Sequence, residues 1–426
     1  MSEDGTIDGV RYVVLVQGLC ACSFHGPSLT ADGLPPSDAT DAPLIDTALD
    51  VPLALDVPIL VDATLGDAPS CSDWMPKPKH FDPCLIGEPT MGGLDLAMAG
   101  TYTYDTTGAG TLTSPLGAQV AHQRTTASGA IIVDAVSFTV ESGATLRVIG
   151  DKPLIIASWS AIAIVGTIDA GSHAGASGAG ASAATSCTQM PGVSDPSGGG
   201  SGGGGGGAFH GKGGNGGQGD NDTPNPGGPG GAAIGVPVVP RAGCPGASSG
   251  KAGASAIAPS TSSTVSPGGL GGGAIQLTAR SSATVTGRIT AGGAGGGGAP
   301  AGSACGGGGA GAGGYIGIES PIMTIVGTLA AYGGGGGGSA PFAGTGGPGQ
   351  DGAASATAAM GGPASSCSDL GPSGSAGATL DGGNADNVVV ACGGGGGGGG
   401  AGYVLLFGGA ITAGSTISPA AQLNPF

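Results

Sequence analysis

The sequence predicts an all-β protein, a solenoid of stacked strands that carries long glycine-rich insertions and follows an N-terminal tether. Two observations lead to this fold class. Ninety-eight of the 426 residues are glycine and are gathered into runs, and the segments between the runs are short, rich in β-branched residues and similar to one another. None of these segments is long enough to bury its own apolar face, and repeats of this kind become stable by stacking on a shared core.

Composition and charge narrow the class further. Charged residues make up 9% of the chain and the mean hydropathy is +0.25, whereas disordered chains combine low hydrophobicity with high net charge. We therefore expect a packed core of small and aliphatic residues. The net charge is -17, fifteen of the 28 acidic residues precede residue 100, and no Lys, Arg or His follows Arg288. Because phosphate binding requires clustered Lys and Arg, we expect no nucleic-acid partner.

Residues 1–22 are predicted to be a signal peptide that ends in a lipidation site. Residues 19–22, Leu-Cys-Ala-Cys, resemble a bacterial lipobox, which implies a lipid on Cys22 that holds the protein to a membrane. The opening residues are acidic where a signal peptide is basic, and initiation at Val10 would restore the usual start. The alternative is that residues 12–22 form a buried strand. This apolar run of about ten residues is too short for a membrane-spanning helix, which needs about 20.

Residues 23–70 are predicted to form a disordered tether. They are rich in Pro, Asp and Ala and contain a direct hexapeptide repeat at residues 48–53 and 54–59. Proline at this density disfavours helices and sheets, and repulsion among the aspartates favours an extended, polyproline-like spacer. The leucines and valines of the repeat leave a docking segment as the alternative.

The cysteines indicate an oxidising compartment. Beyond Cys22, seven lie in Gly, Ser and Pro-rich contexts that suit disulfides: Cys71, Cys84, Cys187, Cys244, Cys305, Cys367 and Cys392. Cys71 and Cys84 bracket a compact loop in a small module, residues 71–99, and their spacing favours a bridge. The pairing of the other five stays open, and at least one lies outside any intramolecular pair. A zinc site at Cys71, His80 and Cys84 would offer three ligands where structural zinc needs four, so we expect no metal.

Residues 100–426 contain the repeated strand pairs. Copies lie at residues 154–171, 271–293, 313–334 and, in degenerate form, 402–414. In each copy a strand with alternating aliphatics, such as Ile275 and Leu277, precedes a second strand, and alternation at period two is the strand signature. Between the paired strands stand Gly166, Gly287 and Gly327, where we expect a tight bend with no room for a side chain.

These features together resemble glycine-rich surface lipoproteins of bacteria, notably myxobacteria. In that family a lipobox, an Asp/Pro/Ala tether and a His-Phe-Asp-Pro-Cys stretch, here residues 80–84, precede a glycine-rich β-helix segment that residues 91–420 resemble. The resemblance implies a right-handed parallel β-helix over residues 100–426. It also implies lipid attachment at the outer membrane or the extracellular surface, and it carries no catalytic residue.

The glycine runs allow two interpretations. In the first they are loops that bulge from one edge of the solenoid and are clipped by the cysteines. In the second they pack side by side as polyproline-II-like helices whose N–H and C=O groups bond to neighbouring segments, since buried backbone groups need partners. The second arrangement resembles the polyglycine tips of some phage adhesins and glycine-rich antifreeze proteins.

Motifs for ions and phosphate are weak. Residues 346–351 match half of a calcium-binding GGxGxD repeat but have no tandem copies, and Asp220 with Asp222 marks a near miss. Residues 211–214 lack the rest of a phosphate loop. The sequence therefore predicts no cofactor.

Acid–base chemistry has two candidate pairs. The repeats expose few acids, chiefly Asp134, Glu141, Asp151, Asp169 and Glu319. A hydrolase needs clustered carboxylates with a basic partner. The two pairs in the sequence that come closest to this requirement are Asp151 with Lys152 and Asp169 with His173. We expect each pair to be a solvated turn.

We therefore expect an exported structural or adhesive protein of the cell surface that has no catalytic activity and contacts a cell surface or an extracellular polysaccharide. The alternative is a β-helix polysaccharide lyase or hydrolase, which would bring carboxylates together in a cleft. A third hypothesis, binding of ice or polysaccharide by a flat repetitive face, requires a threonine ladder. Thr284, Thr286 and Thr290 recur too little in the other copies to predict one.

Overall fold

The computed structural model describes residues 70–424, apart from residues 182–185, 196–198, 221–224, 253–264, 342–343, 355–356, 366–369, 376–378, 388–391 and 415. The predicted signal peptide, the lipidation site Cys22 and nearly all of the tether lie outside the described residues. So do Cys367 and Asp222.

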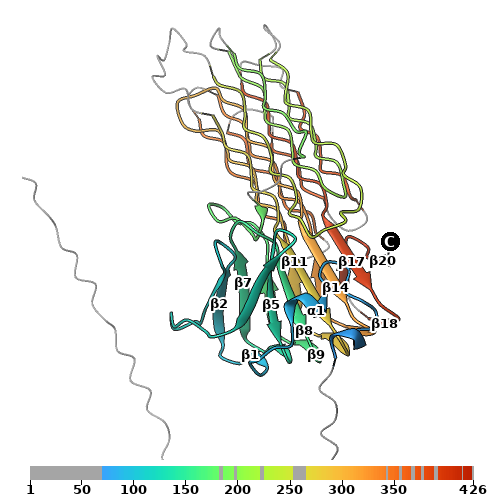
Figure 1. Cartoon of the computed structure of the whole chain (residues 1–426). Helices are drawn as coiled ribbons and strands as arrows, with labels where there is room; N and C mark the ends of the chain where they lie inside the picture. Colours follow the sequence, from blue (N-terminus) through green and yellow to red (C-terminus); the bar gives the residue numbers. More distant parts are fainter. Residues whose placement is uncertain are drawn as a thin grey trace, which may run out of the picture. The chain divides into compact units, whose positions relative to one another are not determined.

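The described chain is built almost entirely of strands, which confirms the all-β class (Figure 1). Two short helical segments precede them, η1 (Cys71–Asp73) and α1 (Pro83–Ile86). Sheet A contains β1 (Leu94–Leu96), β6 (Phe138–Val140), β9 (Ala161–Ile164), β12 (Ser282–Val285), β15 (Ile322–Ile325) and β18 (Ala410–Ala413). Sheet B contains β3 (Thr111–Thr113), β2 (Gly100–Asp105), β7 (Ala144–Ile149), β10 (Thr167–Asp169), β13 (Arg288–Thr290), β16 (Thr328–Ala330) and β19 (Thr416–Ser418). Sheet C contains β4 (Gln123–Ala127), β5 (Ala130–Ala135), β8 (Leu154–Ser158), β11 (Ala274–Ala279), β14 (Tyr315–Glu319), β17 (Tyr403–Phe407) and β20 (Gln422–Leu423).

The chain visits sheet C, then sheet A, then sheet B, and repeats this circuit. β8, β9 and β10 form one circuit, and β11, β12 and β13 form the next. Each strand pairs in parallel with its counterpart in the adjacent circuit, so Ile156, Leu277 and Ile318 share one row of sheet C. Antiparallel strands β3 and β4 end sheets B and C at the N-terminal side. The copies recognised in the sequence are therefore stacked in register.

One apolar core runs through the three sheets. The predicted inward residues Ile275 and Leu277 of sheet C are fully buried, and they belong to the same cluster as Val285 of sheet A and Ile289 of sheet B. Burying one such side chain stabilises the fold by roughly 1.5–3 kcal/mol. Stacking thus supplies the core that a single copy lacks.

Glycine forms the corner between sheets A and B, as predicted. A Cβ on Gly287 would lie 1.9 Å from the carbonyl oxygen of Gly166 in the preceding circuit, and a Cβ on Gly327 would lie 2.0 Å from that of Gly287. Real Cβ atoms do not approach backbone this closely. The three glycines therefore form a row in which each excludes a side chain from the next.

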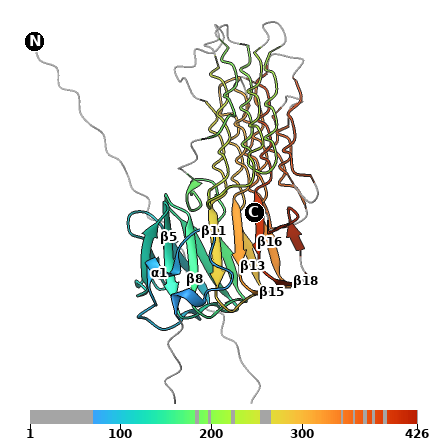
Figure 2. The same cartoon turned by 45° about the vertical axis from the view of Figure 1, so that its right-hand side comes forward.

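The three glycine-rich insertions pack together as a bundle of extended segments, here called the glycine bundle (Figures 1 and 2). They lie between β10 and β11, β13 and β14, and β16 and β17. In residues 306–314 successive amides donate to three different neighbours in rotation. Gly307, Gly308 and Gly309 donate to the carbonyls of Gly394, Gly297 and Ala247, and Ala310 returns to the first neighbour at Gly397. A period of three residues is that of a polyproline-II helix.

Six segments surround residues 306–314. Besides the three acceptors, three further segments donate to it, through the amides of Gly204, Gly337 and Gly269. This pattern satisfies backbone groups that are buried and would otherwise cost free energy. The runs are therefore packed helices, and the interpretation of them as bulging loops is wrong for these residues.

Close approach explains why these helices consist of glycine. A Cβ on Gly204 would lie 2.1 Å from the carbonyl oxygen of Ala247, and a Cβ on Gly397 would lie 2.0 Å from that of Gly214. Collagen uses glycine for the same reason, because only glycine fits where neighbouring chains crowd together.

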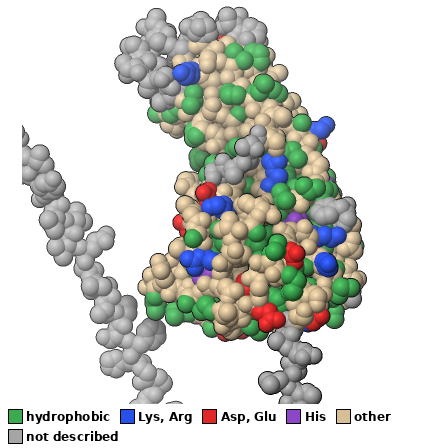
Figure 3. All heavy atoms as spheres, viewed as in Figure 1, with side chains coloured by type: hydrophobic (Ala, Val, Ile, Leu, Met, Phe, Trp, Pro, Cys, Tyr) green, Lys and Arg blue, Asp and Glu red, His purple; other side chains and the backbone are tan. Residues whose placement is uncertain are grey.

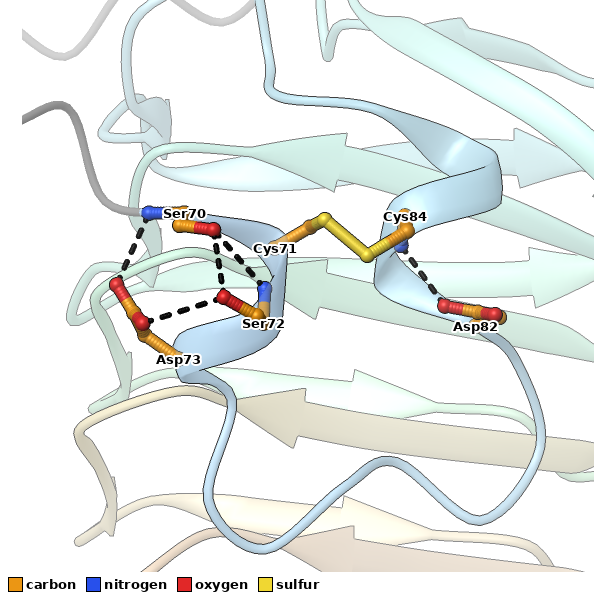
Figure 4. Close-up of a disulfide and its surroundings, with 6 residues drawn as sticks. All are labelled: Ser70, Cys71, Ser72, Asp73, Asp82 and Cys84. Carbon is orange, nitrogen blue, oxygen red and sulfur yellow. Dashed lines mark hydrogen bonds between the residues drawn. A yellow bond between two sulfur atoms is a disulfide. The ribbon is translucent and has the colours of Figure 1, made fainter.

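Residues 70–86 cover part of the outer face of sheet C. Trp74 and Phe81 pack against Ile132, Ile155 and Trp159 in a second apolar cluster. The favoured bridge between Cys71 and Cys84 is present, with an S–S distance of 2.05 Å (Figure 4). It closes the loop that carries these aromatic side chains.

The glycine bundle also contains disulfides. Cys187 is bonded to Cys244, and Cys392 lies in a disulfide as well. Cys305 is fully buried between Ala299 and Ala340. The prediction that the cysteines form disulfides is thus confirmed for Cys71, Cys84, Cys187, Cys244 and Cys392.

Candidate ligand-binding groove

Sheet B carries a row of threonines on its outer face. Alternation turns Leu146 and Ile168 inward and their neighbours outward. Parallel register then aligns one outward residue from each of six strands: Thr101, Thr145, Thr167, Arg288, Thr328 and Thr416. Neighbouring strands lie about 4.8 Å apart, so the row spans roughly 24 Å.

The expectation that threonine recurs too little to form a ladder is wrong. That expectation was based on Thr284, Thr286 and Thr290, which occupy three different positions of one circuit. The ladder on sheet B uses other threonines, and Thr284 belongs to a second row on sheet A, which consists of Thr139, Ala163, Thr284, Thr324 and Thr412. Sequence reasoning missed both rows because long insertions separate their members along the chain.

The row on sheet B lines an open groove of about 790 Å³ that follows the glycine corner. After the corner glycines come Thr145, Thr167, Arg288, Thr328 and Thr416. Before the glycines come Val165, Thr286 and Val326, of which the two valines are 44% and 49% exposed. One side of the groove therefore presents mainly threonine hydroxyl groups, and the other side presents mainly valine methyl groups. The backbone of the corner glycines lies between the two sides.

Among the described residues that line this groove, Arg288 is the one that carries a charge. Its side chain is exposed and makes no hydrogen bond or ion pair with any described residue. Arg147 and Arg280, by contrast, form ion pairs with Asp169 and Asp73.

A smaller cavity of about 350 Å³ adjoins the groove and shares Thr145, Thr167 and Arg288 with it. Here the structure brings together the predicted pair Asp169 and His173 and adds Asp351. The ring nitrogens of His173 lie 2.9 Å from Asp169 Oδ2 and 3.1 Å from Asp351 Oδ2. The hydrogen bonds to these two carboxylates raise the pKa of His173 to about 9.

Both carboxylates of this cluster are held ionised. Burial works to raise the pKa of Asp169, but the hydrogen bond from His173 and the charge of Arg147 outweigh it and lower that pKa. Its Oδ1 also accepts hydrogen bonds from the Gly171 amide and the Thr290 hydroxyl, each at 3.0 Å. The pair is therefore an ion-pair network and not the solvated turn that we expected. The proton of this network therefore lies on His173, and the two carboxylates engage both of its ring nitrogens.

Two other candidate acids, Asp134 and Glu319, are buried on the outer face of sheet C, contrary to the expectation that the repeats expose them. Asp134 accepts a hydrogen bond from the Trp159 indole at 2.8 Å, and Glu319 accepts from the Lys79 amide at 3.1 Å. Burial raises the pKa of Asp134 to about 6 and that of Glu319 to about 7. They stand three strand spacings apart, about 14 Å, so they do not converge.

The remaining motifs have structural partners. Asp151 and Lys152 form a surface ion pair at 3.4 Å, as expected of a solvated turn. Glu141 lies exposed just after β6. In the half calcium motif, Asp351 accepts from the Gly295 amide as well as binding His173. In the half phosphate motif, the Lys212 amide donates to Asp381.

Neither a metal site nor a membrane helix emerges from the part of the chain that the structure describes. Cys71 and Cys84 are joined in a disulfide and cannot ligate zinc. Within the described residues no three His, Cys, Asp or Glu side chains are placed to hold a metal ion. No helix there has the length and apolar character needed to cross a bilayer.

No protein-family model, curated protein or solved structure matches the chain. The resemblance to glycine-rich surface lipoproteins therefore stays a prediction, and the groove has to be interpreted from its own chemistry.

Proposed function

We propose that this protein is an exported structural or adhesive protein of the cell surface, without catalytic activity, that binds an extracellular polysaccharide along the groove of sheet B. The observation that carries the proposal is the in-register row of five threonines and Arg288. A site that repeats about every 4.8 Å matches a linear polymer better than a compact small molecule. Hydroxyl groups suit the hydroxyls of sugars, and the valine methyls suit the apolar faces of sugar rings.

The architecture supports a surface role. We propose that the circuits are turns of a right-handed parallel β-helix, since crossovers between parallel strands of one sheet are right-handed in about 98% of cases. The glycine bundle would act as a stiff stalk, because its segments bond to one another through the backbone and leave few side chains for chemistry. On the face drawn in Figure 3, charged side chains gather mainly over the sheets and are sparse on the bundle.

Binding tests this function directly. Full-length protein should co-sediment with an insoluble polysaccharide, and the triple variant Thr145→Val, Thr167→Val, Thr328→Val should bind at least tenfold more weakly. Each hydrogen bond contributes about 0.5–1.5 kcal/mol, so one substitution alone should cost only a few-fold. The matched control replaces Thr139, Thr284 and Thr324 of sheet A with valine and should bind normally. Equal binding by both triple variants would overturn the groove as the ligand site.

Lipid anchoring at Cys22 is part of the same proposal and rests on the lipobox. The intact mass of protein from the membrane fraction should correspond to a chain that begins at Cys22 and carries acyl groups. A mass that includes residues 1–21 would contradict it.

A polysaccharide lyase or hydrolase is the second candidate, favoured by the cluster of Asp169, His173 and Asp351 beside the groove. Its carboxylates are ionised, and the protonated His173 has both ring nitrogens engaged by them, so no acidic proton is directed at a substrate as general acid catalysis requires. Release of reducing ends or unsaturated sugars by the protein, abolished in His173→Gln, would reverse the order of the two candidates.

A further inference from the structure

We propose that the ligand of this groove is acidic: a linear glycan whose carboxylate or sulfate group binds the guanidinium of Arg288 while its hydroxyls bind the flanking threonines. This inference rests on the proposed function and specifies the chemistry of the polymer.

Arg288 interrupts the threonine row at a position where a neutral residue would serve equally well for packing. Its strand neighbours in the row are Thr167 and Thr328, and all three side chains point out of sheet B. Of the other described arginines, Arg124, Arg147 and Arg241 donate to backbone carbonyls. Arg280 forms an ion pair with Asp73. Among the described arginines, only Arg288 has a guanidinium with no such contact to a described residue, so its donors are available to a ligand.

Among the residues that the structure describes, no carboxylate forms an ion pair with Arg288. Asp169 and Asp351 line the adjoining cavity, but His173 binds both of them and Arg147 binds the first. The guanidinium is therefore open to an anion from outside the protein. A guanidinium is suited to it, because its planar donors engage a carboxylate or sulfate with two parallel hydrogen bonds and it is more weakly hydrated than an ammonium.

The net charge of -17 does not oppose this ligand at the groove. Fifteen of the 28 acids precede residue 100, and the described residues of the groove lining include no acid. Exposed charges more than about 8–10 Å away are largely screened at physiological ionic strength. Among the described residues that line the groove, Arg288 therefore carries the one charge presented to a ligand.

The test is affinity electrophoresis of the full-length protein through gels that contain polygalacturonate, dextran sulfate or neutral dextran. We expect retardation by at least one acidic polymer and little by the neutral one, with the effect reduced by added salt. Retardation by polygalacturonate alone identifies a carboxylate as the recognised group, and retardation by dextran sulfate alone identifies a sulfate.

Variants connect the retardation to Arg288. Arg288→Gln should weaken binding to the acidic polymer at least tenfold, as loss of a charged hydrogen bond does, and Arg288→Lys should restore part of it. The matched control Lys77→Gln removes the same charge from an exposed position on the N-terminal loop and should leave binding intact. Thermal unfolding of each variant confirms that the fold is retained.

The failures of the two proposals are distinguishable. If Arg288→Gln binds every polymer as the wild type does while the groove triple variant loses binding, the acidic ligand is wrong and the polysaccharide groove stands. If neither acidic nor neutral polymers bind and the threonine variants change nothing, the proposed function itself fails.

Discussion

Glu319 shows how burial at a single residue makes stability depend on pH. Its carboxyl lies beneath the 70–86 segment, where it accepts from the Lys79 amide and is 2% exposed. Burial raises its pKa from 4.5 to about 7, so the folded protein binds a proton more tightly than the unfolded chain does. Such a group stabilises the fold most at low pH, and this stability is lost as pH rises from 4.5 through 7.

The variant Glu319→Gln should remove this dependence. At pH 4.5 the variant and the wild type should be about equally stable, and by pH 8 the variant should be more stable by on the order of 1–3 kcal/mol. Urea unfolding at several pH values measures the difference. The comparison must be made between variants, because burial lowers the pKa of His80 to about 4 and gives the wild type an opposite slope. Asp95→Asn, at an exposed position of sheet A, is the control. A constant difference across this range would contradict the assignment.

At the scale of the element, the glycine bundle depends on close backbone contact. A Cβ on Gly204 would meet the carbonyl of Ala247 at 2.1 Å, whereas a Cβ on Gly235 meets nothing within 4 Å. Gly204→Ala should therefore destabilise the protein by about 1–3 kcal/mol through overpacking. Gly235→Ala should be neutral or stabilise it by up to about 1 kcal/mol, because it lowers the entropy of the unfolded chain. Equal effects in thermal unfolding would show that the two sites are packed alike.

At one edge of the glycine bundle, side chains accept the hydrogen bonds of backbone amides. The amides of Lys212, Asn215 and Gln218 recur every third residue and donate to side-chain oxygens at 2.8, 2.8 and 3.0 Å. The acceptors are Asp381, Asn384 and Asn387, which recur with the same period. Inside the bundle, amides such as that of Gly214 donate to backbone carbonyls instead.

Removal of one acceptor should leave one edge amide unpaired. Asn384→Ala should destabilise the bundle by about 1 kcal/mol, the net value of a hydrogen bond, while Asn384→Asp keeps an acceptor oxygen and should cost less. Thermal unfolding gives the first comparison. Amide exchange at Asn215, faster in the alanine variant only, would attribute the loss to this bond; unchanged exchange would refute it.

At the scale of the whole molecule, local signals predicted the strands and their stacking, and packed glycine helices were one of two interpretations, but which segments become neighbours escaped prediction. Alternation at Ile275 and Leu277, and the glycine between paired strands, are visible within a few residues, and the structure confirms both. The glycine helices have no side-chain pattern, and their partners come from different insertions. The groove was missed for the same reason, since Thr167 and Thr328 become neighbours of Arg288 only when the circuits stack.

Stacking also predicts that the bundle and the sheets unfold as one unit. Every insertion leaves from a strand of sheet B and returns to a strand of sheet C, and the described residues belong to one compact unit, Thr64–Phe426. The amides of residues 307–314 are buried and donate to neighbouring segments, as those of a core strand do. Native-state hydrogen exchange should therefore give these amides the same opening free energy as β11 and β14, and Gly204→Ala should lower all of them together. Bundle amides that exchange while the strands stay protected would show instead that the bundle opens on its own.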